Sequence, residues 1–351
     1  MKLLLHSESI SERGDSTNAE AYCRGLKEFY NIDSIIVYQE NSNANNANRI
    51  KEIASKYTIE PYKSQKDLHA IGKNFGATHS YFMNSGIYSA EWVKNTKRIS
   101  HAVFNYFEPH GDVYAYCSKY LLNVALDSKN RATSSFKNFC KRAVSKSPYQ
   151  INYSLQPTYV SHCVYTEEAS GLEFRLRYKI PSSAFLVGRI GGLTQFDDLA
   201  AQQAVKNLLE KNDYFFCFVN TLKFVDHPRA IFIDYLSNSQ KWSFYEACDL
   251  LLNGRLMGET FGFSIVEPLM LGKPVIAPAL TRNLKMDKNH IEILRSHKYL
   301  YNDSNDIFEK ITRYRNVSSE TNILKKLVDQ FKPEIVIKTF YEKFLLDAGV
   351  S

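Results

Sequence analysis

The chain has 351 residues, of which 44% are hydrophobic and 23% are charged. This composition is typical of a folded globular protein, and the length suits two domains of ordinary size. A disordered chain, a collagen-like chain and a protein with several membrane spans are therefore excluded. The first apolar run, Leu3 to Leu5, already ends at His6, so the sequence predicts neither a secretory leader nor a membrane-spanning helix.

The charge balance is moderately basic: 44 Lys and Arg against 37 Asp and Glu give a formal net charge of +7. Basic residues concentrate locally in "KNFCKRAVSK", residues 137–146, which suits a phosphate-rich substrate, a nucleic acid or an anionic membrane face. Solvated surface lysines are the simpler explanation of the same segment, and the one we favour. The six cysteines form no CxxC pair, which argues against a disulfide framework or a zinc site. We expect a cytoplasmic protein, with the inner face of a membrane as an alternative location.

Strand-like and helix-like segments alternate along the first half, which favours α/β structure with parallel sheets. The expected strands are Lys2–His6, Ser34–Tyr38, Thr78–Met83 and Arg98–Phe104. The expected helices are Thr17–Tyr30, Asn48–Tyr57, Ser64–Phe75 and Val113–Leu126. Residues 127–160 are less regular and contain Pro148 and Pro157, which indicates a connecting region.

A second alternating set follows in the other half. Strands are expected at Ala184–Ile190, Tyr214–Asn220, Ala230–Leu236, Asp249–Asn253 and from Pro274 onward. Helices are expected at Phe196–Lys211, Lys241–Ala247 and Phe261–Gly272. The tail, Glu334–Leu346, is an amphipathic helix with one apolar side made of Ile335, Val336, Phe340, Phe344 and Leu345. Two successive open α/β halves predict a cleft between them, where ligands bind at the carboxyl ends of the strands.

The segment Asn253–Ala279, "NGRLMGETFGFSIVEPLMLGKPVIAPA", carries the strongest functional signal. It follows one expected strand and runs into another, so its middle is a loop that opens a helix. Small and polar residues there let the free N–H groups of the helix start approach a diphosphate. Glu259 and Glu267 flank this point, with backbones up to ~12 Å apart along a helix. Such a pair of carboxylates suits a ligand with hydroxyl groups at both ends, as in a nucleotide sugar. The plain alternative is an amphipathic helix with two solvated glutamates.

Glu259 and Glu267 have seven residues between them, inside "GETFGFSIVEPLMLGKPVIA". In this form the segment resembles the E-x(7)-E motif of retaining GT-B glycosyltransferases, most closely of family 4, also called glycosyl transferases group 1. In that family the first Glu contacts the donor sugar, the intervening amides hold the diphosphate and the second Glu binds the nucleotide ribose. The resemblance implies these roles for Glu259 and Glu267, and donor contacts for Thr260, Phe261, Gly262, Phe263 and Ser264.

A second segment, "FLVGRIGGLTQFDDLAAQQAV" (Phe185–Val205), is similar to the first strand, loop and helix of the C-terminal domain in that family. The family places an Arg on the donor phosphates here, a position that Arg189 takes, and Gly191 and Gly192 would let the loop approach. A guanidinium at this point stabilises charge on a departing diphosphate. A Lys that the family often has nearby is replaced by Thr194 and Gln195. Arg255 and Lys223 are the candidate substitutes.

The N-terminal half offers weaker candidates. His101 stands where many members of the family carry a His that faces the donor sugar, although a lone His after a strand is as often a core residue. His110 and Asp112 share the following loop. The first loop contributes Gly14, Asp15 and Ser16, which suit either a phosphate or acceptor loop or a plain helix N-cap.

The resemblance implies two Rossmann-like, doubly wound α/β domains facing across a cleft. We place an N-terminal acceptor-side domain at 1–160, a nucleotide-sugar-binding domain at 161–332 and a last helix, 333–351, against the N-terminal domain. The expected donor is a UDP-sugar or GDP-sugar. The expected acceptor is the hydroxyl group of a glycan, a lipid-linked saccharide or another compound, and a membrane surface is an alternative peripheral partner. "FDDL" opens a helix and no DxD motif precedes a suitable strand, so neither a metal ion nor a cofactor is expected.

Other function classes remain open from the sequence. A nucleotide-sugar epimerase uses the same two-domain fold and needs no acceptor. A protein that binds nucleotide or nucleic acid without catalysis is compatible with the basic charge. No interleaving of aromatic and basic residues resembles a known RNA or DNA module, so we do not expect a nucleic-acid partner, although DNA as a glycosyl acceptor is not excluded.

Overall fold

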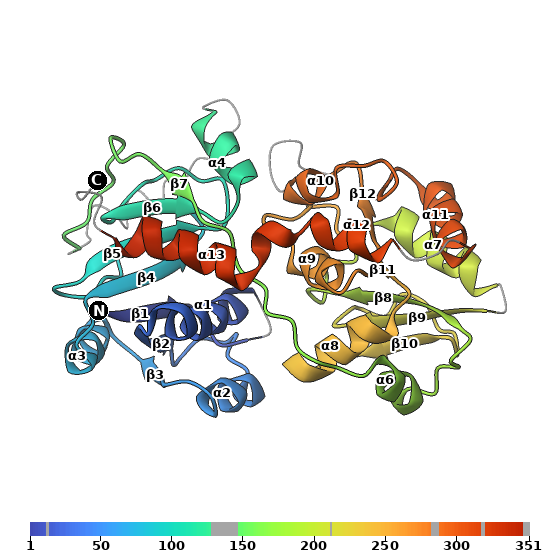
Figure 1. The fold of residues 1–351 in the computed structure, drawn as a ribbon, viewed down its shortest axis with the longest axis horizontal. Helices are drawn as coiled ribbons and strands as arrows, with labels where there is room; N and C mark the ends of the chain where they lie inside the picture. Colours follow the sequence, from blue (N-terminus) through green and yellow to red (C-terminus); the bar gives the residue numbers. More distant parts are fainter. Residues whose placement is uncertain (12–13, 128–146, 211–212, 282–287, 317–319, 347–351) are drawn as a thin grey trace. The chain divides into compact units, whose positions relative to one another are not determined.

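A computed structural model describes residues 1–11, 14–127, 147–210, 213–281, 288–316 and 320–346. The basic segment 137–146 singled out above lies outside the described residues. The chain divides into two compact units: unit 1 contains 1–163 and 331–351, and unit 2 contains 164–330. Each unit is an α/β domain built on its own parallel sheet (Figure 1). Within the described part of the chain, no helix is both long enough and apolar enough to cross a membrane.

Unit 1 is built on a seven-stranded sheet in the order β3-β2-β1-β4-β5-β6-β7, with every pair of neighbours parallel. The strands are β1 (Lys2–Ser7), β2 (Asp33–Gln39), β3 (Ile59–Tyr62), β4 (His79–Asn84), β5 (Lys97–Ala102), β6 (Val113–Tyr116) and β7 (Thr158–Tyr159). Pro61 lies in β3, an edge strand, where a missing N–H is tolerated. That proline also explains why the sequence pattern did not predict a strand there.

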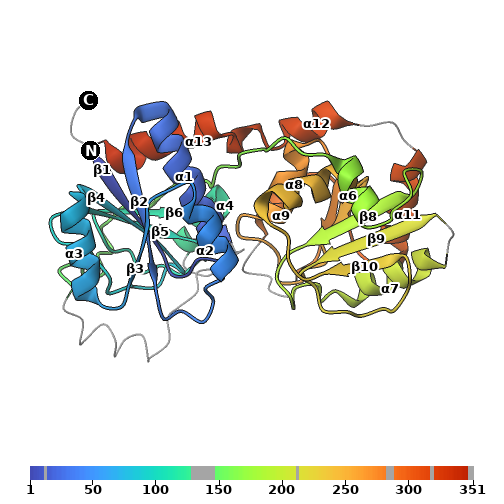
Figure 2. The same cartoon turned by 90° about the horizontal axis from the view of Figure 1, so that it is seen from below.

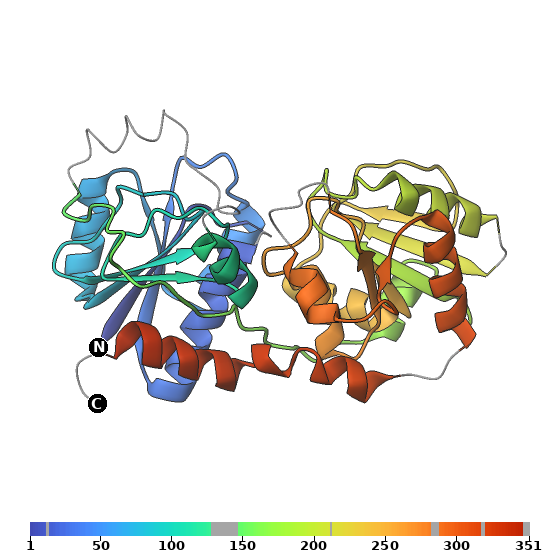
Figure 3. The ribbon, with the colours of Figure 1, turned by 90° about the horizontal axis from the view of Figure 1, so that it is seen from above.

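The helices of unit 1 cover both faces of its sheet. They are α1 (Gly14–Tyr30), α2 (Ala47–Ala54), α3 (Gln65–Phe75), α4 (Lys119–Leu126) and α13 (Pro333–Phe340). On one face α13, from the end of the chain, packs beside α1 (Figure 3), and the rings of Tyr22 and Phe340 are 4.5 Å apart. On the other face α3 lies against a cluster that includes Leu4, Phe82 and Leu68. A capping box of Ser64 and Asp67 begins α3.

Two expectations for unit 1 are wrong in detail. The segment Val113–Leu126 is a strand followed by a helix, because Ser118 accepts from the Leu121 amide and so starts α4 at Lys119, six residues later than expected. In the tail, Ile335 is 45% exposed, whereas Ile337 joins Val336 and the later aromatic residues in the core. The tail also changes at Tyr341 from α13 into a π-helical turn, Tyr341–Leu345, which alters the phase of its apolar side.

Unit 2 is built on a six-stranded parallel sheet in the order β10-β9-β8-β11-β12-β13. The strands are β8 (Phe185–Ile190), β9 (Tyr214–Val219), β10 (Ala230–Ile233), β11 (Leu250–Leu252), β12 (Val275–Pro278) and β13 (Leu300–Tyr301). Their near-continuous apolar runs are typical of strands buried on both faces. The order runs outward in both directions from β8, so the chain reverses direction across the sheet between β8 and β11. Ligands of open α/β sheets bind outside the carboxyl ends of the strands at such a switch point.

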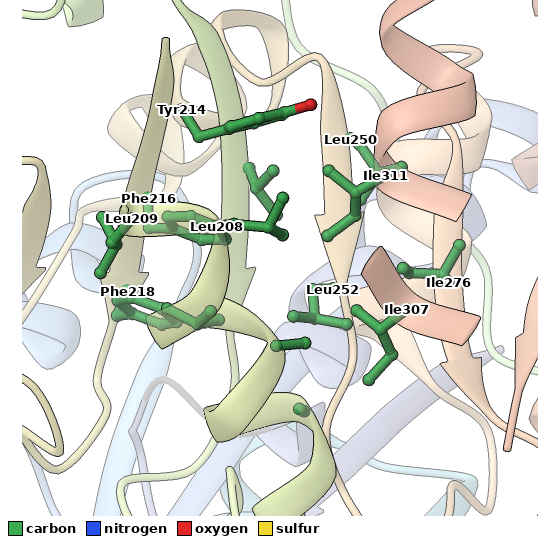
Figure 4. Packing of buried hydrophobic residues seen from close by; sticks show 14 of the residues in the cluster. Leu208, Leu209, Tyr214, Phe216, Phe218, Leu250, Leu252, Ile276, Ile307 and Ile311 are labelled. Atoms are coloured by element: carbon green, nitrogen blue, oxygen red, sulfur yellow. The ribbon is translucent and has the colours of Figure 1, made fainter. Parts of the chain in front are cut away.

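The helices of unit 2 are α6 (Gly171–Arg177), α7 (Leu199–Leu209), α8 (Asn238–Ala247), α9 (Phe263–Met270), α10 (Asn289–Leu294), α11 (Ser304–Asn316) and α12 (Thr321–Lys326). Figure 2 shows α6 and α8 on one side of β8, β9 and β10, and α7 on the other. The apolar faces of α7 and α11 meet the strands in a core that contains Leu208, Phe216, Leu252 and Ile311 (Figure 4). This core fixes the strand ends from which the candidate site extends.

Candidate functional site

The candidate site of unit 2 lies at the switch point, where the loops after β8 and β11 are adjacent. Leu251 of β11 pairs with Gly188 of β8, so both loops leave the same edge of the sheet. Hydrogen bonds join them: the Gly254 carbonyl accepts from the Asp197 and Asp198 amides at 3.2 Å, and an Asp197 oxygen accepts from the Leu256 amide at 3.0 Å. The two sequence segments with the strongest functional signal are therefore parts of one structure.

The loop after β11 ends in a helix start that has no side-chain cap. Gly262 is the N-cap residue of α9, with φ +93°, a left-handed conformation that favours glycine. Its carbonyl accepts from the Ile265 and Val266 amides at 2.9 Å, but it has no side chain that could cap the first turn. By contrast, Asp198 caps α7 and Ser237 caps α8. The start of α9 carries the positive end of the helix dipole. This is a site suited to an anion.

Glu259 lies just before this helix start and is held by two neighbouring side chains. Its carboxylate is only 12% exposed and accepts from Arg255 Nη1 at 2.8 Å and from Asn253 Nδ2 at 3.1 Å. Asn253 also contacts the Ser264 hydroxyl at 3.3 Å, which ties the loop to the first turn of α9. The Arg255 Nε has no hydrogen-bond partner among the described residues, so its guanidinium keeps donor capacity.

The backbone of the turn from 259 to 262 is fixed from α10. The Asn289 amide donates to the Glu259 carbonyl at 3.0 Å, and Asn289 Nδ2 donates to the Phe261 carbonyl at 3.0 Å. Phe261 is buried and its ring lies 4.7 Å from that of Phe263. Thr260, Phe263 and Ser264 are partly exposed. The turn is thus rigid, with its polar side chains at the surface of unit 2.

Glu267, expected at the ribose, is 3% exposed and is held by α8. One carboxylate oxygen forms an ion pair with Lys241 Nζ, and the other accepts from the Tyr245 hydroxyl at 2.7 Å. The carboxylates at both ends of the motif are therefore buried and paired, so the alternative of two solvated glutamates is wrong.

Arg189 is also buried, at 4% exposed, but its hydrogen bonds go to the protein itself. Nη1 donates to the Asn220 carbonyl at 2.9 Å and to the Thr221 hydroxyl at 2.5 Å, and Nη2 donates to the Gly192 carbonyl at 3.0 Å. Burial lowers the pKa of Arg189 to about 10, which the negative charge of Glu259 opposes. Arg189 therefore holds the loops after β8 and β9 together.

The glycines of the β8 loop leave room for protein groups. A Cβ added at Gly191 would lie 2.8 Å from Arg189 Nη2, and one at Gly192 would lie 2.7 Å from the Gln195 side chain. Gln195, one of the two residues that replace the family's Lys, accepts from the Gly192 amide at 3.2 Å. Lys223, a candidate substitute, pairs with Asp226 at an exposed position. Arg255 is thus the candidate cation that lies at the start of α9.

In unit 1 the first-loop candidates lie at the corresponding switch point, between β1 and β4. Gly14 begins α1, and an oxygen of Asp15 accepts from the Ser7 hydroxyl at 3.4 Å. The Ser16 hydroxyl is fully buried, donates to the Ser9 carbonyl at 3.0 Å and accepts from the Ser11 amide at 2.9 Å. Ser16 therefore folds the loop back onto itself.

His101 lies in the core of unit 1 and not at a ligand-facing surface. It is 0% exposed, its Nδ1 is 2.7 Å from the Tyr81 hydroxyl, and its ring packs against His162 and Phe344. The expectation that His101 faces the donor sugar is not supported by this position, and the core alternative describes it better. His110, also fully buried, is 2.6 Å from the Glu108 carbonyl. Asp112 accepts from the Arg98 amide at 2.6 Å.

This burial has a consequence for stability against pH. Burial lowers the pKa of His101 from 6.5 to about 4. The unfolded chain therefore takes up a proton near pH 6.5 that the folded chain resists until about pH 4, so stability falls over this window by about 1.4 kcal/mol per pH unit for this residue. Glutamine takes up no proton in this range, so the free energy of unfolding of His101→Gln should fall less steeply with decreasing pH, by about 1.4 kcal/mol per pH unit. Urea unfolding between pH 7.5 and 4.5, followed by Trp92 fluorescence in a Trp242→Phe background, measures it; equal slopes would assign the acid sensitivity elsewhere.

Sequence reasoning missed four residues that shape the site: Asn253, Asn289, Lys241 and Tyr245. Asn253 had a signal, since a polar residue directly after the buried strand β11 lies at the carboxyl edge of the sheet. The other three act through contacts with residues distant in the sequence. Only the packing of α8 and α10 against the motif brings them to the site.

Comparison with known structures agrees with this architecture. The structure of the Anabaena protein HepE in complex with UDP and glucose superposes with a TM-score of 0.62 at 13% sequence identity, covering 97% of this chain and 98% of HepE. Sucrose-phosphate synthase from Thermosynechococcus elongatus gives a TM-score of 0.57 at 13% identity, covering 97% of each chain. The lipopolysaccharide outer core galactosyltransferase WaaB gives 0.57 at 12% identity, covering 98% of this chain and 99% of WaaB. No protein-family model and no curated protein sequence matches the chain.

These neighbours are GT-B glycosyltransferases, and the chain has their fold: two parallel-sheet α/β domains over almost its whole length. The fold class expected from the sequence is confirmed.

Proposed function

We propose that this chain is a glycosyltransferase that moves a sugar from a UDP-sugar or GDP-sugar to an acceptor hydroxyl, with retention at the anomeric carbon and without a metal ion. The observation that carries the proposal is the uncapped start of α9 at the switch point of unit 2, with a buried, paired carboxylate on each side. The neighbours solved with UDP and with UDP-glucose support a nucleotide-sugar donor.

Each end of the donor has a partner in this proposal. The N–H groups at the start of α9 bind the diphosphate. Glu259 accepts hydrogen bonds from the donor sugar, and Glu267 accepts them from the ribose. Arg255, paired with Glu259, supplies the positive charge beside the diphosphate that the missing Lys would supply. Arg189 is a positioning residue that keeps the β8 loop in place, because its donors are bound to loop oxygens.

In this proposal, the charged groups of the site stabilise the charges that develop during the transfer of the sugar. The bond from the anomeric carbon to the diphosphate breaks, and the acceptor oxygen bonds to the same face of the sugar. The leaving phosphate takes the acceptor proton, since no carboxylate is assigned as a nucleophile. Positive charge that builds on the sugar is balanced by Glu259, and negative charge on the leaving group by Arg255 and the α9 dipole. The acceptor is a glycan, a lipid-linked saccharide or another hydroxyl compound.

Gly262→Ala tests the helix start directly. Alanine is strained at φ +93°, and its Cβ would lie 3.2 Å from Glu259 Cβ, so the turn must shift. UDP or GDP at about a hundred times its dissociation constant should raise the melting temperature of the wild-type chain by about 5 °C. Gly262→Ala should lose most of this shift.

Gly76→Ala is the matched control, because Gly76 is also left-handed, with φ +73°, but ends α3 in unit 1 with nothing within 4 Å of an added Cβ. It should keep the full nucleotide shift. If no nucleoside diphosphate or nucleotide sugar stabilises the wild-type chain, the proposed function is wrong. Conversion of a donor sugar without any acceptor would indicate an epimerase instead.

A further inference from the structure

Two side chains of α8 hold Glu267 at the centre of the candidate site. Lys241 and Tyr245 are four residues apart and so lie on the same face of α8. The Lys241 ammonium pairs with one oxygen of Glu267, and the Tyr245 hydroxyl donates to the other at 2.7 Å. The side chains of Glu267 and Lys241 are 5% and 16% exposed, and Tyr245 is 1% exposed.

The α8 helix is built to present these groups. Ser237 and Gln240 form a capping box that fixes its first turn, directly before Lys241. Trp242 is buried next to it, with the Lys241 ammonium 5.5 Å from the centre of its ring. The Lys241 ammonium and the Tyr245 hydroxyl therefore lie on a helix whose position is fixed, and together they hold the Glu267 carboxylate in one orientation.

This arrangement leaves part of the hydrogen-bond acceptor capacity of Glu267 free. A carboxylate offers about four acceptor positions, of which the two α8 groups use two. Burial, and next the charge of Glu267, raise the pKa of Tyr245 well above 10, so its hydroxyl stays protonated and donates at neutral pH. The remaining acceptor positions suit two neighbouring hydroxyls, as on a ribose.

Stability alone does not require such a trio. Buried ion pairs are often replaced by apolar residues of similar volume without loss of stability. Specificity for the ligand explains the trio better: Lys241 and Tyr245 fix the orientation of the Glu267 carboxylate. A site built to bind a hydroxyl group strongly rejects an analogue that lacks this hydroxyl.

We propose that Lys241 and Tyr245 are positioning residues that orient Glu267 for the ribose diol, and that this trio sets the preference for ribonucleotides over deoxyribonucleotides. The inference rests on the proposed function, because it takes the nucleotide of the donor as the ligand of Glu267. Neither residue touches the reacting atoms; both act through the Glu267 carboxylate.

The experiment compares the affinities of UDP and 2′-deoxy-UDP, and of GDP and 2′-deoxy-GDP, by isothermal titration calorimetry. The wild-type chain should prefer the ribonucleotide by about a hundredfold or more. Lys241→Met and Tyr245→Phe should each reduce this ratio by about tenfold, through weaker binding of the ribonucleotide and nearly unchanged binding of the deoxyribonucleotide.

Lys273→Met is the matched control. Lys273 pairs with Glu246 of α8 at 3.4 Å and is 23% exposed. The substitution therefore removes a comparable ion pair to α8 and leaves the partners of Glu267 in place. It should keep the wild-type ratio. Tyr245→Phe keeps the ring that fills the core, which leaves a folded variant to measure if Lys241→Met unfolds.

The outcomes separate the two proposals. An unchanged ratio in folded Tyr245→Phe and Lys241→Met, with tight UDP or GDP binding, overturns the role of α8 alone. An equal loss in Lys273→Met also overturns it, since the effect is then structural. Binding of neither UDP nor GDP by the wild-type chain overturns the proposed function, and this inference with it.

Discussion

Glu259→Gln should lower the turnover of the donor about a hundredfold, the loss typical of removing one electrostatic partner of a transition state. The reason is that the amide keeps the shape of the side chain but removes the negative charge facing a sugar that becomes positive as its bond to the diphosphate breaks. Affinity for the free nucleoside diphosphate should stay within about threefold, because the proposed function places that part of the donor at α9 and Glu267. Steady-state transfer and nucleotide titration on the same preparation measure both quantities.

The control for Glu259→Gln is Glu320→Gln. Glu320 is a half-buried carboxylate of unit 2, 24% exposed, which pairs with Lys298 as Glu259 pairs with Arg255. Loss of that pair should leave turnover unchanged. A Glu259→Gln enzyme with normal turnover would show that this carboxylate only holds Arg255 in place.

The central strands of each sheet and the longer helices of unit 1 were predictable because their signals are local. In unit 2 the sequence indicated α7, α8 and α9, but not α6, α10, α11 or α12. Apolar runs such as 214–219 and 275–278 identify buried strands, and a capping residue followed by an apolar pattern identifies a helix. The failures are also local. In Val113–Tyr116 four residues read equally well as strand or helix, and only pairing with β5 makes them a strand.

The candidate site was predictable to the extent that its residues follow one strand. Glu259, Gly262 and Glu267 share one loop and helix, so their spacing along the chain fixes their arrangement. Partners were not predictable, because Lys241 and Asn289 reach the motif from separate helices. The position of His101 in the sequence matches the family, but the sequence did not indicate that His101 is buried, with Phe344 from the end of the chain packed against its ring.

Arg189 stands at the position expected from the sequence, but its hydrogen bonds go to loop oxygens of the protein, which the sequence did not indicate. In the sequence, an arginine beside a glycine-rich loop indicates a phosphate-binding residue. The protein oxygens that compete with a phosphate for its hydrogen bonds cannot be predicted from the sequence. The folded chain supplies them: the carbonyls of Asn220 and Gly192 and the Thr221 hydroxyl already occupy three of its donors. Hydrogen bonds from a charged group contribute about 1.5–3 kcal/mol each, so truncation of Arg189, which leaves these oxygens without their donor, should destabilise unit 2.

Arg189→Lys separates the two roles of this position. If Arg189 held the diphosphate by charge, lysine would restore much of the turnover, because lysine binds phosphate as a point charge. We expect the opposite, because the single ammonium of lysine cannot donate to the three oxygens that the guanidinium reaches. Arg189→Lys should therefore lose about 3 kcal/mol of the free energy of unfolding, nearly as much as Arg189→Ala. The turnover of Arg189→Lys should fall as well. Urea unfolding followed by Trp242 fluorescence in a Trp92→Phe background, together with transfer assays, measures both. A stable Arg189→Lys variant with much higher turnover than Arg189→Ala would instead show that Arg189 binds the diphosphate by its charge.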